Sequence, residues 1–210
     1  MREEPAGALL NELLAASGPP ELSLETANRF EAYLALLMRW NGRLNLTAIR
    51  DEKGILSRHF LESIVCAREI PAGTATLLDF GTGAGFPGIP IALCRPEISV
   101  TLTESQAKKA AFLQEALRTL QLSNAKVYAG RAEGLRNTFD CLVMRAVDRM
   151  EKAVGVAPKL VSPGGWLVLM TTSSELSSLQ AAAGSDIQWK ESVGLLQGGD
   201  RVIALGARRL

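Results

Sequence analysis

The chain has 210 residues, of which 47% are hydrophobic and 21% are charged, and its formal net charge at pH 7 is +1. A chain of this size can bury a full hydrophobic core as one domain, with room for a small appendage. The near-zero net charge excludes bulk electrostatic attraction to nucleic acid, so binding of that kind would need a local basic patch.

Three further features of the sequence indicate the cellular compartment. No apolar run reaches the length of a membrane span, and Glu3 and Glu4 lie where a signal peptide would become apolar. The three cysteines form no C-x-x-C pair, which argues against a disulfide framework or a zinc site and for a reducing compartment. His59 is the single histidine, so a metal cluster is not expected. We expect a cytoplasmic protein with no membrane partner and no metal.

Three helices are predicted in the first third of the chain. Apolar residues at helical spacing indicate a short helix over residues 6–17, which a Gly-Pro-Pro sequence ends. A longer amphipathic helix follows and ends near residues 39–47, and a third helix is expected over residues 54–68. This part of the chain contains no repeat and no low-complexity segment.

A change of organisation is predicted near residue 73. Pro71 and Gly73 mark a candidate hinge, and beyond it strands and helices alternate, which is the pattern of a parallel sheet. We therefore expect an N-terminal helical region over residues 1–73 and an α/β domain over residues 74–210, packed together as one compact unit.

The α/β domain begins with a strand, a glycine-rich turn and a helix start. The predicted strand over residues 76–80 contains Asp79, and four glycines follow within residues 81–88. Glycine lets the backbone turn sharply and lets a ligand approach without a Cβ in the way. Open α/β sheets bind ligands at such a turn, beyond the carboxyl end of a strand.

Two cofactors use this kind of turn. The NAD pattern is G-x-G-x-x-G directly after the strand, but its third glycine would fall on Phe86, and the literal pattern appears only two residues late. The alternative, acid-x-G-x-G-x-G, is matched by Asp79, Gly81, Gly83 and Gly85. It resembles motif I of the S-adenosylmethionine-dependent methyltransferases. A tight turn with no cofactor is the third interpretation.

The remaining elements predict how the sheet ends. Strands are expected over residues 99–103, 126–129, 141–144 and 166–170, with helices over residues 106–120 and near 150–160. Two last strand-like segments, 187–196 and 201–206, are separated only by residues 197–200, so they should form an antiparallel hairpin. A parallel sheet closed in this way resembles the seven-stranded, Rossmann-like sheet of class I S-adenosylmethionine-dependent methyltransferases.

Candidate cofactor-binding residues follow the second and third strands. Glu104 ends the second strand roughly 20 residues after the glycines, where an acid can accept hydrogen bonds from both ribose hydroxyls. The alternative is a cap for the helix that Gln106 opens. After the third strand, the backbone N–H of Ala132 and the carboxylate of Glu133 can read the edge of an adenine; a solvated loop is the alternative.

Arg145 directly follows the fourth strand, at the rim position where methyltransferases place catalytic groups. The Asp/Asn-Pro-Pro-Tyr/Phe sequence that exocyclic-amine methyltransferases commonly carry there is absent, and no cysteine is placed to attack a pyrimidine. A site without a general base suits an acceptor atom with a free lone pair, such as guanine N7, whose methylation requires alignment more than proton abstraction. The alternative for Arg145 is a structural ion pair, with Asp148.

Basic residues gather in the helical region. Arg39, Arg43 and Arg58 can hold phosphates, and Trp40 or His59 can stack on bases. The alternative is a solvated helix face with Trp40 in the core.

Several blocks together resemble the 16S ribosomal RNA (guanine-N7)-methyltransferase G family, whose older name is glucose-inhibited division protein B. The blocks are residues 39–47, 58–63, 79–90 and 145–146, within a likeness over about residues 28–206. The resemblance implies transfer of a methyl group from S-adenosylmethionine to N7 of guanine 527, in the 530 loop of 16S rRNA. The partner would be 16S rRNA in the small ribosomal subunit or an assembly intermediate, and we expect a monomer.

Matching positions carry the family's site residues onto this chain. Cofactor contacts are implied at Gly81, Gly83, Phe86, Glu104, Ala132, Glu133 and Arg145, with RNA-facing arginines at Arg131 and Arg201. Arg145 is the candidate catalytic residue.

The chain departs from the family pattern at three positions. Glu62 and Glu104 stand where Asp is usual, and Thr171 stands where Lys is often found. Two rival functions remain. An NAD-dependent oxidoreductase is disfavoured by the glycine register and the closing hairpin, and a non-catalytic RNA-binding protein is kept open by the absent Lys.

Overall fold

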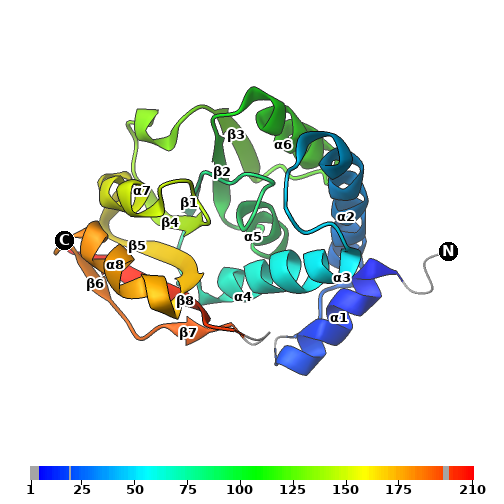
Figure 1. Ribbon diagram of the computed structural model, residues 1–210, viewed down its shortest axis with the longest axis horizontal. Coiled ribbons are helices and arrows are strands. Elements are labelled where there is room, and N and C mark those ends of the chain that lie inside the picture. The colour runs from blue at the N-terminus through cyan, green and yellow to red at the C-terminus, as the bar shows by residue number, and fades with distance from the viewer. Residues whose placement is uncertain (1–4, 19, 196–198) are drawn as a thin grey trace.

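The computed structural model describes residues 5–18, 20–195 and 199–210. A mostly parallel sheet runs through the molecule, and helices cover both of its faces (Figure 1). This layered arrangement is the predicted α/β class. In the described ranges, no helix is both long and apolar enough to cross a membrane.

The first third of the chain is helical, as predicted. α1 (Ala6–Ser17) and α2 (Leu24–Leu44) match the expected helices. The third one is interrupted, because a π-helix (Ile55–Leu61) lies between α3 (Glu52–Gly54) and α4 (Glu62–Glu69). π-Helical turns are rare and often occur at functional sites. Apolar spacing does not separate them from α-helix, so the sequence carried no signal for this one.

In the part of the chain that the structure describes, eight strands form one sheet. They are β1 (Thr76–Phe80), β2 (Ser99–Glu104), β3 (Ala125–Ala129), β4 (Phe139–Arg145), β5 (Val161–Thr172), β6 (Ile187–Trp189), β7 (Val193–Gly194) and β8 (Arg201–Arg208). Their order is β3-β2-β1-β4-β5-β8-β6, and β7 also pairs with β8. β1 to β5 pair in parallel, and β8 is antiparallel to β5, β6 and β7. The antiparallel ending is confirmed.

The prediction of one strand over residues 187–196 was wrong in one respect. Trp189 pairs with Gly206, but Val193 pairs with Ile203, so one extra residue lies on the outer strand between them. Such a bulge interrupts the ladder and divides the segment into β6 and β7. Residues 196–198, which include half of the predicted turn, lie outside the described residues.

The two faces of the sheet are covered by different helices. α5 (Gly88–Cys94) and α6 (Ala107–Thr119) cover one face together with the N-terminal helices. α7 (Met150–Val156), a 3-10 turn (Ala157–Leu160) and α8 (Ser173–Ala183) cover the other. Successive strand residues alternate between the two resulting hydrophobic clusters, as the two-residue period of a strand requires.

The N-terminal helices pack directly on the glycine-rich turn. Tyr33 of α2 is fully buried and stacks on Phe60 with ring centroids 5.2 Å apart. Its hydroxyl donates a 2.5 Å hydrogen bond to the backbone carbonyl of Ala84, inside the turn. A buried aromatic cluster with satisfied polar atoms therefore holds the turn against the helical region.

Candidate cofactor and acceptor site

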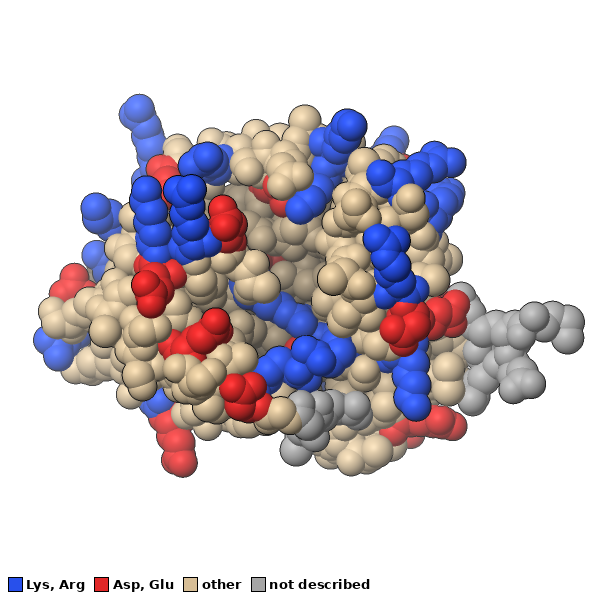
Figure 2. Space-filling view, in the orientation of Figure 1, with Lys and Arg blue, Asp and Glu red and all other residues tan. Residues whose placement is uncertain are grey.

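The carboxyl ends of β1 to β4 open into a crevice. Two adjoining cavities of about 320 and 430 Å³ occupy it, and both are lined by Gly81, Glu104 and Val147. Figure 2 shows a hollow at the centre of this face, with basic side chains along its border. The residues predicted to follow the separate strands thus lie together at one edge of the sheet.

Asp79 holds the glycine-rich turn from below. Its carboxylate is fully buried and accepts hydrogen bonds from the Thr82 hydroxyl at 2.5 Å and from the Gly88 N–H at 2.8 Å. Burial raises the pKa of Asp79 to about 7, and these two hydrogen bonds oppose that rise. The acid of the sequence pattern is therefore a support for the turn and does not line the crevice.

The glycines of the turn have two different roles. A Cβ on Gly85 (φ +95°) would lie 2.5 Å from Ile89 Cδ1 and 2.6 Å from the Tyr33 hydroxyl, so close packing requires glycine there. Gly83 also has a positive φ, but a Cβ on it would meet no described atom within 4 Å. Gly83 therefore leaves open space beside the backbone on the crevice side.

The ribose and adenine candidates line the crevice. Glu104 lines both cavities. Its Oε1 accepts a 2.7 Å hydrogen bond from the Gln106 N–H, so one carboxylate oxygen caps the following helix, as the alternative proposed. Arg131, Ala132 and Glu133 all line the smaller cavity, where a 3-10 turn follows β3.

His59 and Phe86 form the wall of the larger cavity nearest the helical region. Their rings stack with centroids 4.6 Å apart, and His59 Nε2 hydrogen-bonds the Thr47 hydroxyl at 2.6 Å. Burial lowers the pKa of His59 to about 3, with further lowering by the positive charges of Arg145 and Arg58. The ring is therefore neutral at pH 7.

Arg145 belongs to a cluster of three arginines around one carboxylate. Glu62 is 3% exposed and lies 3.0 Å from Arg145 Nη2, 2.6 Å from Arg201 Nη2 and 3.5 Å from Arg58 Nε. Arg145 Nη2 also donates to the backbone carbonyl of Arg58 at 2.6 Å. Burial lowers the pKa of Arg145, and the Glu62 charge opposes this. The ion-pair alternative for Arg145 is thus realised, with Glu62 in place of Asp148.

Glu62 was not among the predicted site residues. Its one local signal is the four-residue spacing from Arg58 on a predicted helix, where opposite charges lie on the same face. Its ion-pair partners on β4 and β8 are far from it in the sequence, and no residue spacing predicts that they meet.

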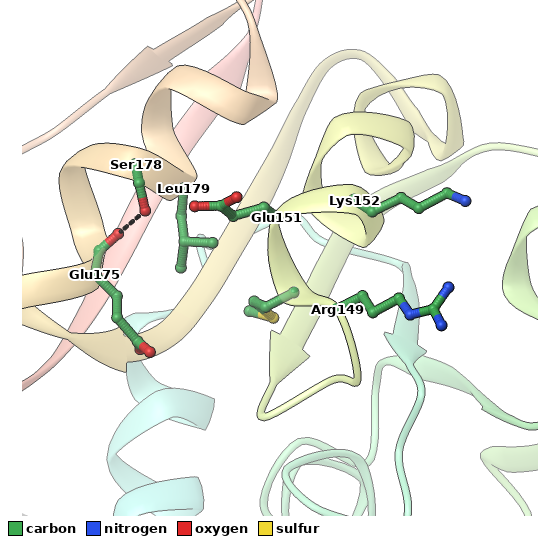
Figure 3. A pocket seen from close by; sticks show the side chains of 7 residues that line it. Arg149, Glu151, Lys152, Glu175, Ser178 and Leu179 are labelled. Atoms are coloured by element: carbon green, nitrogen blue, oxygen red, sulfur yellow. Dashed lines mark hydrogen bonds between the residues drawn. The ribbon is translucent and has the colours of Figure 1, made fainter.

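A neighbouring cavity of about 420 Å³ lies between α7 and α8 (Figure 3). Figure 3 shows Arg149 and Lys152 pointing to one side of α7, away from Glu175 on α8. Both basic residues also line the smaller crevice cavity, beside Arg131. They add positive charge to the crevice rim that sequence reasoning had not singled out.

Arg39 and Arg43 lie away from the crevice. With Trp40 and Leu44 they line a separate cavity of about 100 Å³ on α2, and Arg39 forms an ion pair with Glu115. The Trp40 ring meets a core phenylalanine edge-on, as the core alternative proposed. Of the predicted RNA-binding arginines, the structure brings three to the carboxyl edge of the sheet, namely Arg58, Arg131 and Arg201.

The crevice fits an elongated cofactor that passes a glycine-rich turn. It offers open space at Gly83, an acid at the end of β2, and a second cavity beside Ala132. Together with the antiparallel ending of the sheet, these features define a class I S-adenosylmethionine-dependent methyltransferase fold.

Solved structures share this fold. A methyltransferase from Pyrococcus furiosus is similar with a TM-score of 0.62 and 16% identity, covering 88% of this chain and 100% of that one. The ribosomal protein L11 methylase from Lactobacillus delbrueckii subsp. bulgaricus has a TM-score of 0.61 and 13% identity, over 73% and 79% of the two chains.

The particular family follows from the sequence. The family model for rRNA small subunit methyltransferase G matches residues 26–201, so the chain belongs to this family. It is 49% identical over 140 residues to ribosomal RNA small subunit methyltransferase G of Xanthomonas euvesicatoria pv. vesicatoria, over 66% of this chain and 65% of that protein. It is 45% identical over 165 residues to the protein of that name from Stenotrophomonas maltophilia, over 78% and 76%. The predicted family is confirmed, and fold and family both support S-adenosylmethionine as the cofactor.

Proposed function

We propose that this protein transfers a methyl group from S-adenosylmethionine to N7 of guanine 527 in the 530 loop of 16S rRNA. The observation that carries the proposal is the position of Arg145, which lines both the cofactor crevice and a further cavity beside it. One residue thus borders the space for the donor and the space for an acceptor. The family supports ribosomal RNA as that acceptor.

The cofactor site is proposed to be built from backbone and two acids. The turn at Gly81, Gly83 and Phe86 borders the methionine end, and Glu104 accepts hydrogen bonds from the ribose. Ala132 and Glu133 hold the adenine edge. When bound, S-adenosylmethionine supplies an electrophilic methyl group.

The acceptor side is proposed to work by alignment. Guanine N7 brings its own lone pair, so this chain's residues need only hold it in line and exclude other approaches. His59 is neutral, stacked and hydrogen-bonded to Thr47, so it is a wall of the site and not a base. Arg145 orients the acceptor, and Arg39, Arg43, Arg58, Arg131 and Arg201 contact RNA phosphates.

The partner is proposed to be 16S rRNA in the small ribosomal subunit or in an assembly intermediate. The protein would meet this substrate in the bacterial cytoplasm, as a monomer. The family description, rRNA small subunit methyltransferase G, supports the RNA partner.

The decisive experiment uses small subunits purified from a strain that lacks this protein. Tritium transfer from labelled S-adenosylmethionine should occur, and nucleoside mass spectrometry should identify 7-methylguanosine. Cleavage at the modified guanine should then map to the 530 loop. Methylation of an exocyclic amine, a ribose or a pyrimidine carbon would contradict the proposed target while leaving the enzyme class intact.

A second candidate is an RNA-binding protein without catalysis. It is favoured by Thr171, which takes the place of a lysine and whose hydroxyl donates to Glu175 at 2.9 Å. No cation therefore projects from this position of β5. The same tritium assay separates the two candidates, because this one requires RNA binding with no transfer.

A further inference from the structure

A cavity of about 370 Å³ lies beside the cofactor crevice, between the π-helix, the end of β4, and strands β5 and β8. Its wall on one side carries Arg58, Arg145 and Arg201 around Glu62, and Met150, Met170 and Leu195 also line it. The volume falls within the range of small-molecule sites, about 300–1,000 Å³. It is therefore large enough for more than a single ion.

The arginine wall has an excess of positive charge. One carboxylate faces three guanidinium groups, whose side chains are 46%, 14% and 17% exposed at Arg58, Arg145 and Arg201. Glu175 also lines the cavity, but its Oε2 accepts hydrogen bonds from two threonine hydroxyls at 2.9 and 3.1 Å. Among the described residues that line this cavity, three are arginines and two are glutamates, and a net positive charge that is partly buried favours an anion as a partner.

The arginine wall also has an unused hydrogen-bond donor. Arg145 Nη1 is buried and has no hydrogen-bond partner among the described residues. A planar guanidinium with a spare N–H suits the paired oxygens of a phosphate group.

Part of the remaining lining is apolar. Met170 and Leu195 are buried, and Met150 is half-buried at the start of α7. Methionine adapts its shape and packs well against aromatic rings, which suits it to the flat face of a base. The cavity thus offers a surface for a phosphate and a surface for a base within one enclosure.

A thin wall separates this cavity from the cofactor crevice. Arg145, Ala146 and Val147 line both spaces. Ala146 has a φ of +47°, an uncommon conformation for a residue with a Cβ, and such strained turns cluster at functional sites.

We propose that this cavity holds one unpaired nucleotide of the RNA substrate, the one that is methylated, with its phosphate on the arginines around Glu62 and its base against the methionines. This rests on the proposed function and specifies its acceptor site. Enzymes that modify a base take it out of the stack into such a pocket. Glu62 is then a positioning residue, since it joins arginines from three separate segments.

The test measures binding of guanosine 5′-monophosphate and of guanosine by calorimetry. Saturating S-adenosylhomocysteine is present, so that the cofactor crevice cannot take the probe. The monophosphate should bind more tightly than the nucleoside, and Arg58→Gln should weaken monophosphate binding about tenfold and leave nucleoside binding unchanged. Met150→Ala should weaken both probes. Arg58 is half exposed, so its variant should fold, which a melting curve checks.

Arg29→Gln is the matched control, because Arg29 lies on α2, where it forms an ion pair with Glu25. It should leave binding of both probes unchanged. No measurable monophosphate binding by the unaltered protein, or equal binding by Arg58→Gln, would overturn the proposed subsite. Failure of the proposed function has a different signature, namely monophosphate bound in the cavity with no methyl transferred to small subunits.

Discussion

The cofactor crevice and the arginine cavity adjoin each other but are built in different ways. The glycine-rich turn of the crevice is held by residues close in sequence, since Asp79 bonds Thr82 and Gly88 within the same strand, turn and helix. The arginine cavity depends on side chains from three distant segments that meet at Glu62. A turn held by its own strand and helix can form when one supersecondary unit folds. A cavity made of charged side chains exists only when the whole chain is folded.

The largest predicted effect comes from Glu62→Gln. This change keeps the shape of the side chain but leaves three guanidinium groups without their carboxylate. Removing one partner of a buried ion pair costs about 3–5 kcal/mol, so the free energy of unfolding in urea should fall by that order. Methyl transfer should fall with it, because the arginines lose their common position.

Glu62→Asp is the control for this change. It keeps the charge and shortens the reach, so most of the stability and part of the activity should remain. S-adenosylmethionine affinity should be retained by both folded variants. If Glu62→Gln is as stable as the unaltered protein, the carboxylate does not hold the arginine cavity together.

The same contrast explains what the sequence predicted and what it missed. The order of the strands and the glycine turn were predicted because hydrophobic period and glycine spacing are local signals, but β5 begins at Val161, five residues before the predicted start. Arg145 and Arg201 were each named, but their common carboxylate was noted only as a departure from a family pattern. The π-helix and the bulge between β6 and β7 were missed because both change backbone pairing without changing the hydrophobic pattern.

The second prediction compares two glycines of the crevice turn. Gly85→Ala should destabilise the fold by about 1–3 kcal/mol more than Gly83→Ala, because its Cβ would overlap Ile89 and the Tyr33 hydroxyl. Both positions have a positive φ, but +95° at Gly85 lies further from the left-handed region that alanine can adopt than +59° at Gly83, so backbone strain adds to the packing term at Gly85. Urea denaturation gives the stability difference.

The affinity for S-adenosylmethionine should not follow the order of stability of these two variants. Gly83→Ala places a methyl group in the crevice, so it should weaken S-adenosylmethionine binding while the fold is kept. Equal stability losses for the two variants would mean that the turn is not fixed by its packing on α2.

The third prediction concerns the pH dependence of stability that arises from His59, in the wall of the larger crevice cavity. The folded-state pKa of His59 is about 3, against about 6.5 when unfolded. The stability that it contributes is therefore full above about pH 6.5 and is lost as the pH falls toward 3, by up to about 1.4 kcal/mol per pH unit. His59→Gln keeps a group that can bond Thr47 but does not titrate in this range.

The stability advantage of the unaltered protein over His59→Gln should shrink by about 2 kcal/mol between pH 6.5 and pH 5. Asp79 changes stability in the opposite direction, because its raised pKa of about 7 makes stability fall as the pH rises above 3.8. That contribution is common to both proteins and cancels in the difference. A pH-independent difference would show that the ring is solvated and does not form a buried wall.

The smallest predicted effect asks how far the acceptor side extends. Arg39 and Arg43 lie on α2, outside both the crevice and the arginine cavity, and Arg39 is engaged with Glu115. An exposed ion pair contributes about 0–1 kcal/mol to stability, so Arg39→Gln/Arg43→Gln should melt normally. If the two arginines contact RNA phosphates, the slope of log affinity against log salt should flatten by about 0.7 per lost contact to single-stranded RNA. Arg29→Gln, on the same helix, should leave that slope unchanged. An unchanged slope in the double variant would confine RNA contact to the crevice rim and the arginines around Glu62. The RNA-binding surface would then not extend onto α2.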